Sequence, residues 1–466
     1  MARTSAIRQF FSPRDMSQGA PWKRIVEFAI PMVIGNVAQQ LYNTADSIIV
    51  GQYVGDNALA AVGTAAPIFN LMLALFVGVS TGAGILVAQS FGAKDYKRLS
   101  QIVGNCISLM FLVSVITTVL GIAAARPLLN LLGTPDSVIN WSTQYLQIYF
   151  AGIIGCAYYN IFSGILRGLG DSFSALLFLL VAAALNVVLD LWFVAGFDMG
   201  VAGVAYATIL AQAISAVLCF IKLRSMRDVL TLRWGLLRLQ KSCVGSIVRL
   251  GVPSGITQAI FSMAMLVVQS LTNSFGETLM ACNVIVMRVD GFAMMPNFTF
   301  GETMSTFTGQ NIGAGRLDRV QKGTKQGVCI AMGTAAVITS LLLLIGPALM
   351  GVFTDTQELV NLGARILRTL AVGYILVALT QSLSGVMRGS GNTVIPMWIS
   401  LCTTVIIRVP LAYIMIAMSR TEANPQGDPM FIFISLLISW ILGAAITSTV
   451  YATGVWKKHL QKKTPI

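Results

Sequence analysis

The chain has 466 residues, of which 56% are hydrophobic and only 11% are charged, with a formal net charge of +13. Apolar runs of about 20 residues, the length that crosses a bilayer as a helix, recur along it. This composition excludes an ordinary soluble domain and predicts an all-α polytopic membrane protein. The seven cysteines lack metal-ligand spacing and the single histidine, His459, lies near the C-terminus. A zinc site, a histidine proton relay and a Ser-His-Asp triad are therefore excluded from the membrane segments.

The apolar segments predict twelve transmembrane helices. In chain order they span approximately 25–54, 57–90, 99–125, 138–163, 172–195, 200–223, 246–274, 280–311, 321–348, 359–386, 393–417 and 429–454. They form two six-helix lobes, 25–223 and 246–454, between a polar tail at 1–24, a linker at 224–245 and a second tail at 455–466. The tail at 1–24 has no apolar core of a signal peptide. Four leucines among basic residues predict a short amphipathic helix on the membrane surface within the linker.

Basic residues concentrate in both tails, in the linker and in the loops after the other even-numbered helices. Acidic residues dominate the opposite loops. By the positive-inside rule, both termini are expected in the cytoplasm. The positive net charge then follows from topology and contact with anionic lipid, so we expect no nucleic-acid partner.

Three motifs of the first half recur in the second half at offsets of 221 or 222 residues. They pair Ile25–Pro31 with Ile247–Pro253, Gln89–Ala93 with Gln310–Ala314, and Gly164–Asp171 with Gly385–Asn392. A shift of six helices preserves orientation. The two lobes are therefore predicted to be related by a pseudo-two-fold axis along the membrane normal.

A polar stripe runs along the first predicted helix. Asn36, Gln39, Asn43 and Asp46 share one face of it, and Pro31 earlier in the helix invites a bend. A carboxylate deep in an apolar helix is costly in lipid, and such residues normally face a bundle interior or water-filled cavity and mark a pathway. The alternative interpretation is a buried aspartate that caps a neighbouring helix break.

Further polar residues lie on the fifth and sixth predicted helices. Asn186 and Asp190 are one turn apart and share a face, as do Thr208 and Gln212. The alternative interpretation of Asn186 and Asp190 is a structural hydrogen-bond pair at a helix end.

The second half lacks the matching acids. Asp46 aligns with Val268, and Asn186 and Asp190 align with Ile407 and Leu411. Charged residues on its eighth and eleventh helices are instead Arg288, Asp290, Glu302 and Arg408. Opposite charges in similar numbers favour internal ion pairs over a second coupling site.

Together these motifs resemble the multidrug and toxic compound extrusion (MATE) transporters over nearly the whole chain. The markers are Pro31 with Tyr42-Asn43-x-x-Asp46, Gln-x-x-Gly-Ala at the end of helices two and eight, and Arg-Gly-x-Gly after helices four and ten. Residue by residue, Asp46, Asn186, Asp190 and Thr208 match the cation and proton site of the DinF-like branch of the MOP flippase superfamily. Two carboxylates with amide and hydroxyl oxygens suit a small cation such as Na⁺, and without it the carboxylates would share a proton.

The resemblance implies secondary-active multidrug efflux by cation antiport, with H⁺ or Na⁺ moving in and an organic cationic or amphipathic solute moving out. It implies rocking-bundle alternating access, no enzymatic activity and no cofactor beyond the coupling ion. It places a substrate cavity between the lobes, lined in the first lobe by Gln39, Tyr42, Asn43, Tyr145 and Asn160. Tyr145 and Asn160 would share a face of helix four. We expect a monomer in the plasma (inner) membrane of a prokaryote, in contact with lipid.

Three alternatives stay open at this point. A MOP-superfamily flippase for a lipid-linked or anionic substrate would need basic residues in the central cavity, where Arg288 and Arg408 are the intramembrane candidates. An intramembrane enzyme could use Asp46 and Asp190 as an aspartyl dyad, but no protease motif surrounds either residue and the repeat argues against it. A channel shares this composition.

Overall fold

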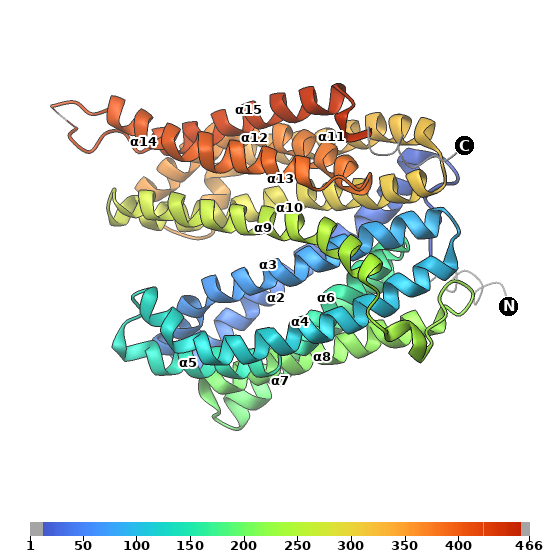
Figure 1. Ribbon diagram of the computed structural model, residues 1–466. Coiled ribbons are helices and arrows are strands. Elements are labelled where there is room, and N and C mark those ends of the chain that lie inside the picture. The colour runs from blue at the N-terminus through green and yellow to red at the C-terminus, as the bar shows by residue number, and fades with distance from the viewer. Residues whose placement is uncertain (1–12, 423, 458–466) are drawn as a thin grey trace. The chain divides into compact units, whose positions relative to one another are not determined.

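The computed structural model describes residues 13–422 and 424–457, which are almost entirely helical (Figure 1). The first half contains α2 (Pro21–Tyr53), α3 (Asp56–Gly92), α4 (Tyr96–Leu131), α5 (Asp136–Ala151), α6 (Ile153–Gly168), α7 (Ser172–Asp190) and α8 (Gly200–Ser225). The second half contains α9 (Lys241–Asn273), α10 (Glu277–Gly313), α11 (Leu317–Gly351), α12 (Gln357–Gly389), α13 (Val394–Leu401), α14 (Arg408–Met418) and α15 (Met430–Ala452). Short π-helical segments follow α7 (η1, Leu191–Gly196) and α13 (η3, Cys402–Ile407), and single 3₁₀ turns occur at Trp234–Leu237 (η2) and Val455–Lys457 (η4).

These helices cover the twelve predicted segments, and the all-α prediction is confirmed. In the described part of the chain, ten helices are long and apolar enough to cross a membrane, or eleven if the bent pair α5–α6 counts as one span. Helix α2 is 33 residues long, about 50 Å at 1.5 Å per residue. It falls outside this set because its polar stripe lowers its apolar content.

The fourth predicted helix is not straight. It is bent by 53° between α5 and α6. A Cβ at Gly152, between the two helices, would lie 2.5 Å from the side chain of Ile209, so only glycine permits this approach to α8. The prediction of one continuous fourth helix is therefore wrong, and Tyr145 lies on α5 while Asn160 lies on α6.

The predicted amphipathic helix in the linker is also wrong. Residues 226–240 form irregular chain apart from the 3₁₀ turn η2. Their backbone groups bond to α4 instead, since Thr231 N donates to Ser100 Oγ at 3.0 Å and Gln240 N donates to Asn105 Oδ1 at 2.6 Å. These side-chain acceptors replace the hydrogen bonds that a helix would have supplied.

The chain forms two compact units, and two helices are divided between them. Each unit contains the first part of one of these helices, and the other unit contains the rest. The first unit holds 30–255 and the described residues up to Met16, and the second holds Ser17–Ala29 and the described residues from Ile256 onward. Helix α2 changes unit after Ala29, and α9 changes unit after Gly255. A proline lies close to each change, Pro31 in α2 and Pro253 in α9.

Glycines allow α9 to approach α3 within the first unit. A Cβ at Gly78 would lie 2.7 Å from Gly255 Cα, and one at Gly82 would lie 2.7 Å from Gly251 N. Two small-xxx-small pairs therefore face each other, as in closely packed membrane helices. Most of the buried apolar side chains of this unit gather in one core from α3, α4, α5 and α6.

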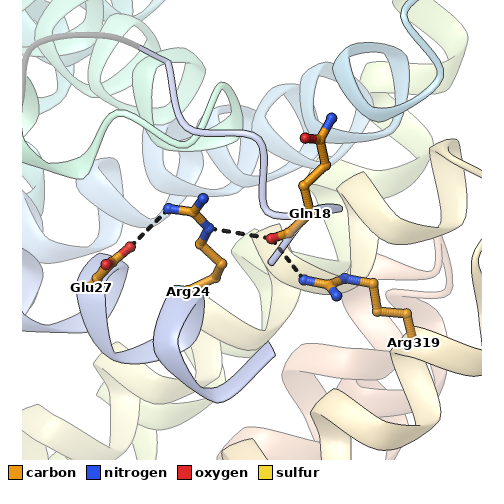
Figure 2. A network of polar contacts seen from close by, with 4 residues as sticks. All are labelled: Gln18, Arg24, Glu27 and Arg319. Atoms are coloured by element: carbon orange, nitrogen blue, oxygen red, sulfur yellow. Dashed lines mark hydrogen bonds and ion pairs between the residues drawn. The ribbon is translucent and has the colours of Figure 1, made fainter. Parts of the chain in front are cut away.

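In the second unit, the segment before α2 is held against α11. Arg319 donates to the carbonyl oxygens of Gln18 at 3.0 Å and Gly19 at 2.6 Å, and Trp22 N donates to Gln326 Oε1 at 3.0 Å. Figure 2 shows Arg24 beside this contact, where it donates to Gln18 O at 3.3 Å and pairs with Glu27 at 3.0 Å. Ion pairs and carbonyl contacts thus fix the start of α2 in this unit.

Candidate functional site

Three helices of the first unit bring the predicted ion-coupling residues together. Asp46 lies on α2, Asn186 and Asp190 lie in the last turns of α7, and Thr208 lies on α8. Asp190 is fully buried and is followed at once by the π-helical segment η1. Single turns of π-helix inside membrane helices often mark functional sites.

A helix cap and a tight turn place α8 beside α7. Asp171 caps the start of α7, where its carboxylate accepts from Ser174 N at 2.9 Å. Past η1, Asp198 and Gly200 adopt positive φ angles of 53° and 57°. This tight left-handed turn reverses the chain, so that Thr208 on α8 lies beside Asn186 on α7.

Asn186 connects the carboxylate of α7 to α8. Its amide has good partners in one orientation only, in which the nitrogen donates to Asp190 Oδ2 at 2.9 Å and the oxygen accepts from Thr208 N at 3.3 Å. Thr208 Oγ1 in turn donates to Val204 O at 3.0 Å. These contacts fix the Asp190 side chain, and they leave its other oxygen available for a ligand.

The carboxyl groups of Asp46 and Asp190 approach within hydrogen-bonding reach of each other. A hydrogen bond between two carboxyl groups requires a proton on one of them, and a cation between them would relieve the same repulsion. Within the described chain, Oδ1 of Asp46 and Oδ1 of Asp190 have no hydrogen-bonding partner. The two carboxyl oxygens without a partner suit a proton or a hard cation such as Na⁺.

The residues predicted to line a substrate cavity occupy different positions. The hydroxyl groups of Tyr42 and Tyr145 lie near both carboxyl groups. Asn160 instead donates to Cys156 O at 2.9 Å. Gln39 and Asn43 are exposed on α2. The structure therefore brings the two tyrosines together with the acid pair, and the assignment of the three amides to a substrate cavity stays a prediction.

Charged residues of the second unit have partners that the sequence analysis did not name. Asp290 lies near Tyr374 and Arg408, and Arg408 donates to Ser439 Oγ at 3.0 Å. Glu302 lies near Arg388, which is in the last turn of α12 rather than in the loop that the sequence predicts.

Neither Tyr374 nor Ser439 carried a sequence signal. Arg388 was recognisable only as part of its Arg-Gly-x-Gly motif. Arg288 forms no ion pair among the residues that the structure describes.

Amides occupy the part of the second unit that lies beside Val268, the residue aligned with Asp46. Gln269 Nε2 donates to Asn273 Oδ1 at 2.9 Å, and Asn283 Nδ2 donates to Gln269 Oε1 at 3.2 Å. The two units thus differ chemically at matching places, with carboxyl groups in the first and neutral amides in the second.

A family model described as MatE matches residues 31–192 and 253–414 of this sequence. The chain belongs to the MatE family. The two matched ranges begin at Pro31 and Pro253, the prolines of the internal repeat. The resemblance to MATE proteins is thereby confirmed, and the chain is a transporter rather than an enzyme.

Relatives match the chain over nearly its whole length. It is 29% identical over 452 residues to the probable multidrug resistance protein YoeA of Bacillus subtilis, covering 95% of this chain and 96% of that protein. It is 25% identical over 443 residues to the probable multidrug resistance protein NorM of Thermotoga maritima, covering 94% and 93%.

Solved MATE structures have the same fold. A crystal structure of MATE in the straight conformation is 25% identical, covers 96% of this chain and 99% of that one, and gives a TM-score of 0.88. An outward-facing multidrug resistance MATE transporter of the MOP superfamily is 26% identical, covers 96% and 98%, and gives a TM-score of 0.86. The predicted two-lobed fold is confirmed.

Proposed function

We propose that this MATE protein exports small organic solutes in exchange for an inward-moving cation, with Asp46 and Asp190 as the coupling pair. The observation that carries the proposal is the contact between these two carboxyl groups, each with one oxygen that has no partner among the described residues. A pair of this kind accepts a proton or a small cation and releases it when its surroundings change.

Release of the cation would leave two like charges in contact. At a separation of about 4 Å and an effective dielectric constant of about 20, they repel by about 4 kcal/mol. Because Asp46 lies on α2 and Asp190 on α7, this repulsion acts to separate the two helices. Pro31 supplies a point at which α2 can bend, since it removes one backbone hydrogen bond. Ion binding and helix geometry would thus be coupled within the first unit, as rocking-bundle alternating access requires.

The proposed substrates are organic cations and amphipathic molecules. The names of the similar proteins YoeA and NorM support efflux of several drugs. The acid pair offers negative charge, and Tyr42 and Tyr145 beside it are aromatic residues, and both features attract organic cations. The 21 methionines of the chain would add adaptable apolar contacts. A flippase for anionic substrates is less well supported, because Arg408 is already bonded to Ser439 and lies beside Asp290, which leaves Arg288 as the one remaining candidate of the two.

We further propose that the protein is a monomer in the plasma membrane of a prokaryote, with both termini in the cytoplasm. Support comes from the bacterial sources of the similar proteins and from the concentration of basic residues in both tails and alternate loops.

Transport by purified protein in liposomes tests the proposal. A pH gradient and a Na⁺ gradient are imposed separately, and uptake of a fluorescent organic cation into the liposomes is recorded. Uptake driven by one of the two gradients is expected, and it identifies the coupling ion. Uptake at the same rate with and without either gradient would refute cation antiport.

A further inference from the structure

A cavity of about 340 Å³ lies in the first unit, where α3 ends and α4 and α9 begin. Its wall contains two basic side chains, Lys97 and Arg98, in the first turn of α4. The first turn of α9 contributes Ser242. Leu86 and Ile102 form an apolar part of the wall. The recess therefore combines positive charge, a hydroxyl group and an apolar surface.

The chain itself occupies the matching place in the second unit. Arg319, which aligns with Arg98 at the offset of 221 residues, is buried. Its guanidinium donates to the carbonyl oxygen of Gln18 (Figure 2). It also donates to the carbonyl oxygen of Gly19, in the same segment before α2. Protein oxygens thus satisfy the basic side chain in this unit.

In both units, the segment before a long helix is bound by an equivalent side-chain acceptor. This segment precedes α9 in the first unit and α2 in the second. Gln240 N donates to Asn105 Oδ1 in the first unit, and Trp22 N donates to Gln326 Oε1 in the second. Asn105 and Gln326 are themselves 221 residues apart. The difference is in the arginine, because Arg98 is exposed and its guanidinium forms no hydrogen bond or ion pair with any residue that the structure describes.

We propose that this cavity binds the phosphate group of an anionic phospholipid. Arg98 and Lys97 can pair with phosphate oxygens, and Ser242 and Gln101 add neutral donors. The first backbone N–H groups of α9 lack intrahelical acceptors and add to the positive potential. Asp95 also lines the cavity, but Oδ1 of its carboxylate accepts from Arg98 N at 3.0 Å as the cap of α4. Two positive charges against one negative charge leave a net attraction for an anion.

The position of the cavity favours a lipid over a soluble anion. It lies at the ends of two apolar spans, Asn57–Gly92 and Tyr96–Leu131, which is the depth of lipid headgroups. Leu86 and Ile102 give the start of an acyl chain an apolar contact. A bound headgroup would tie the first turn of α4 to that of α9. The inference does not depend on the proposed coupling pair.

Cys243 provides a reporter because it lines the cavity and is partly exposed. The other six cysteines are replaced, and alkylation of Cys243 by a maleimide is followed with the full chain in nanodiscs. The nanodiscs contain phosphatidylcholine alone, phosphatidylcholine with phosphatidylglycerol, or phosphatidylcholine with added inorganic phosphate. Phosphatidylglycerol is expected to slow the alkylation, and inorganic phosphate at the same anion concentration is not.

Variants test the named side chains. Lys97→Gln with Arg98→Gln should weaken this protection, by about fivefold in lipid affinity for each basic side chain removed. Gln101→Glu should also weaken the protection, because it adds a negative charge to the cavity while Lys97 and Arg98 stay in place. Arg224→Gln with Arg227→Gln removes two exposed basic residues of the same unit that do not line the cavity, and it should leave the protection intact.

Three outcomes would overturn the proposal. Equal slowing at a cysteine placed at exposed Ser225 would mean a general effect of surface charge. Protection that survives in the Lys97→Gln and Arg98→Gln double variant would remove these residues from the site. Protection by inorganic phosphate alone would assign the same phosphate chemistry to a soluble anion and reject the lipid.

Discussion

Replacing Asp46 by Asn removes a titrating group while keeping the shape of the side chain. The amide can still donate a hydrogen bond to Asp190, so the folded state loses about 1 kcal/mol or less. The melting temperature should therefore shift by only about 1 °C, since the entropy of unfolding scales with chain length. The variant can no longer alternate between a charged and a neutral form, and we expect it to bind organic cations but to lose gradient-driven efflux.

The size of the expected loss follows from the stoichiometry. If one monovalent organic cation leaves for each proton that enters, a pH difference of one unit sustains about a tenfold concentration ratio of the solute. In Asp46→Asn this ratio should fall to about one. Asp190→Asn should behave alike. The double variant should be little worse than either single variant, because the two carboxyl groups act as one titrating unit.

Two measurements check this prediction side by side. Dye efflux from energised cells reports coupling, and equilibrium dye binding to purified protein reports folding and recognition. Asp136→Asn, which changes an exposed acid of the same unit, is the matched control and should transport normally. Normal pH- or Na⁺-driven efflux by Asp46→Asn would refute the reasoning and leave Asp46 with a structural role.

Three further predictions concern topology, the second unit and helix packing. Single cysteines at exposed Ser225 and Asn57 in a cysteine-free background should label from opposite sides of the membrane, and labelling from one side would contradict the twelve-helix topology. Asp290→Asn and Glu302→Gln should each lower the yield of folded protein, because each acid lies beside an arginine. Ion coupling measured per folded molecule should fall less than this yield. A stable but uncoupled Asp290→Asn would extend the coupling site into the second unit. Gly82→Ala should cost about 1–3 kcal/mol of stability by thermal unfolding, because its Cβ would lie 2.7 Å from Gly251 N, and an unchanged melting temperature would show that α9 can move away.

The sequence alone was sufficient for the features that depend on local chain properties. A helix forms hydrogen bonds four residues apart, and lipid selects apolar segments of fixed length, so the twelve segments could be read from apolar runs. The repeat at 221 or 222 residues revealed the two lobes. The cost of polar groups in lipid singled out Asp46, Asn186 and Asp190.

Only the tertiary structure decided which distant groups meet. The orientation that joins Asn186 to both Asp190 and Thr208 depends on the turn before α8. The bend at Gly152 coincides with a close approach to Ile209, and the irregular linker is bonded to acceptors on α4. Both are contacts between distant residues, so local periodicity could predict neither. The lone guanidinium of Arg98 and the satisfied one of Arg319 occupy matching sequence positions. Their difference arises because packing supplies carbonyl oxygens to one and an open cavity to the other.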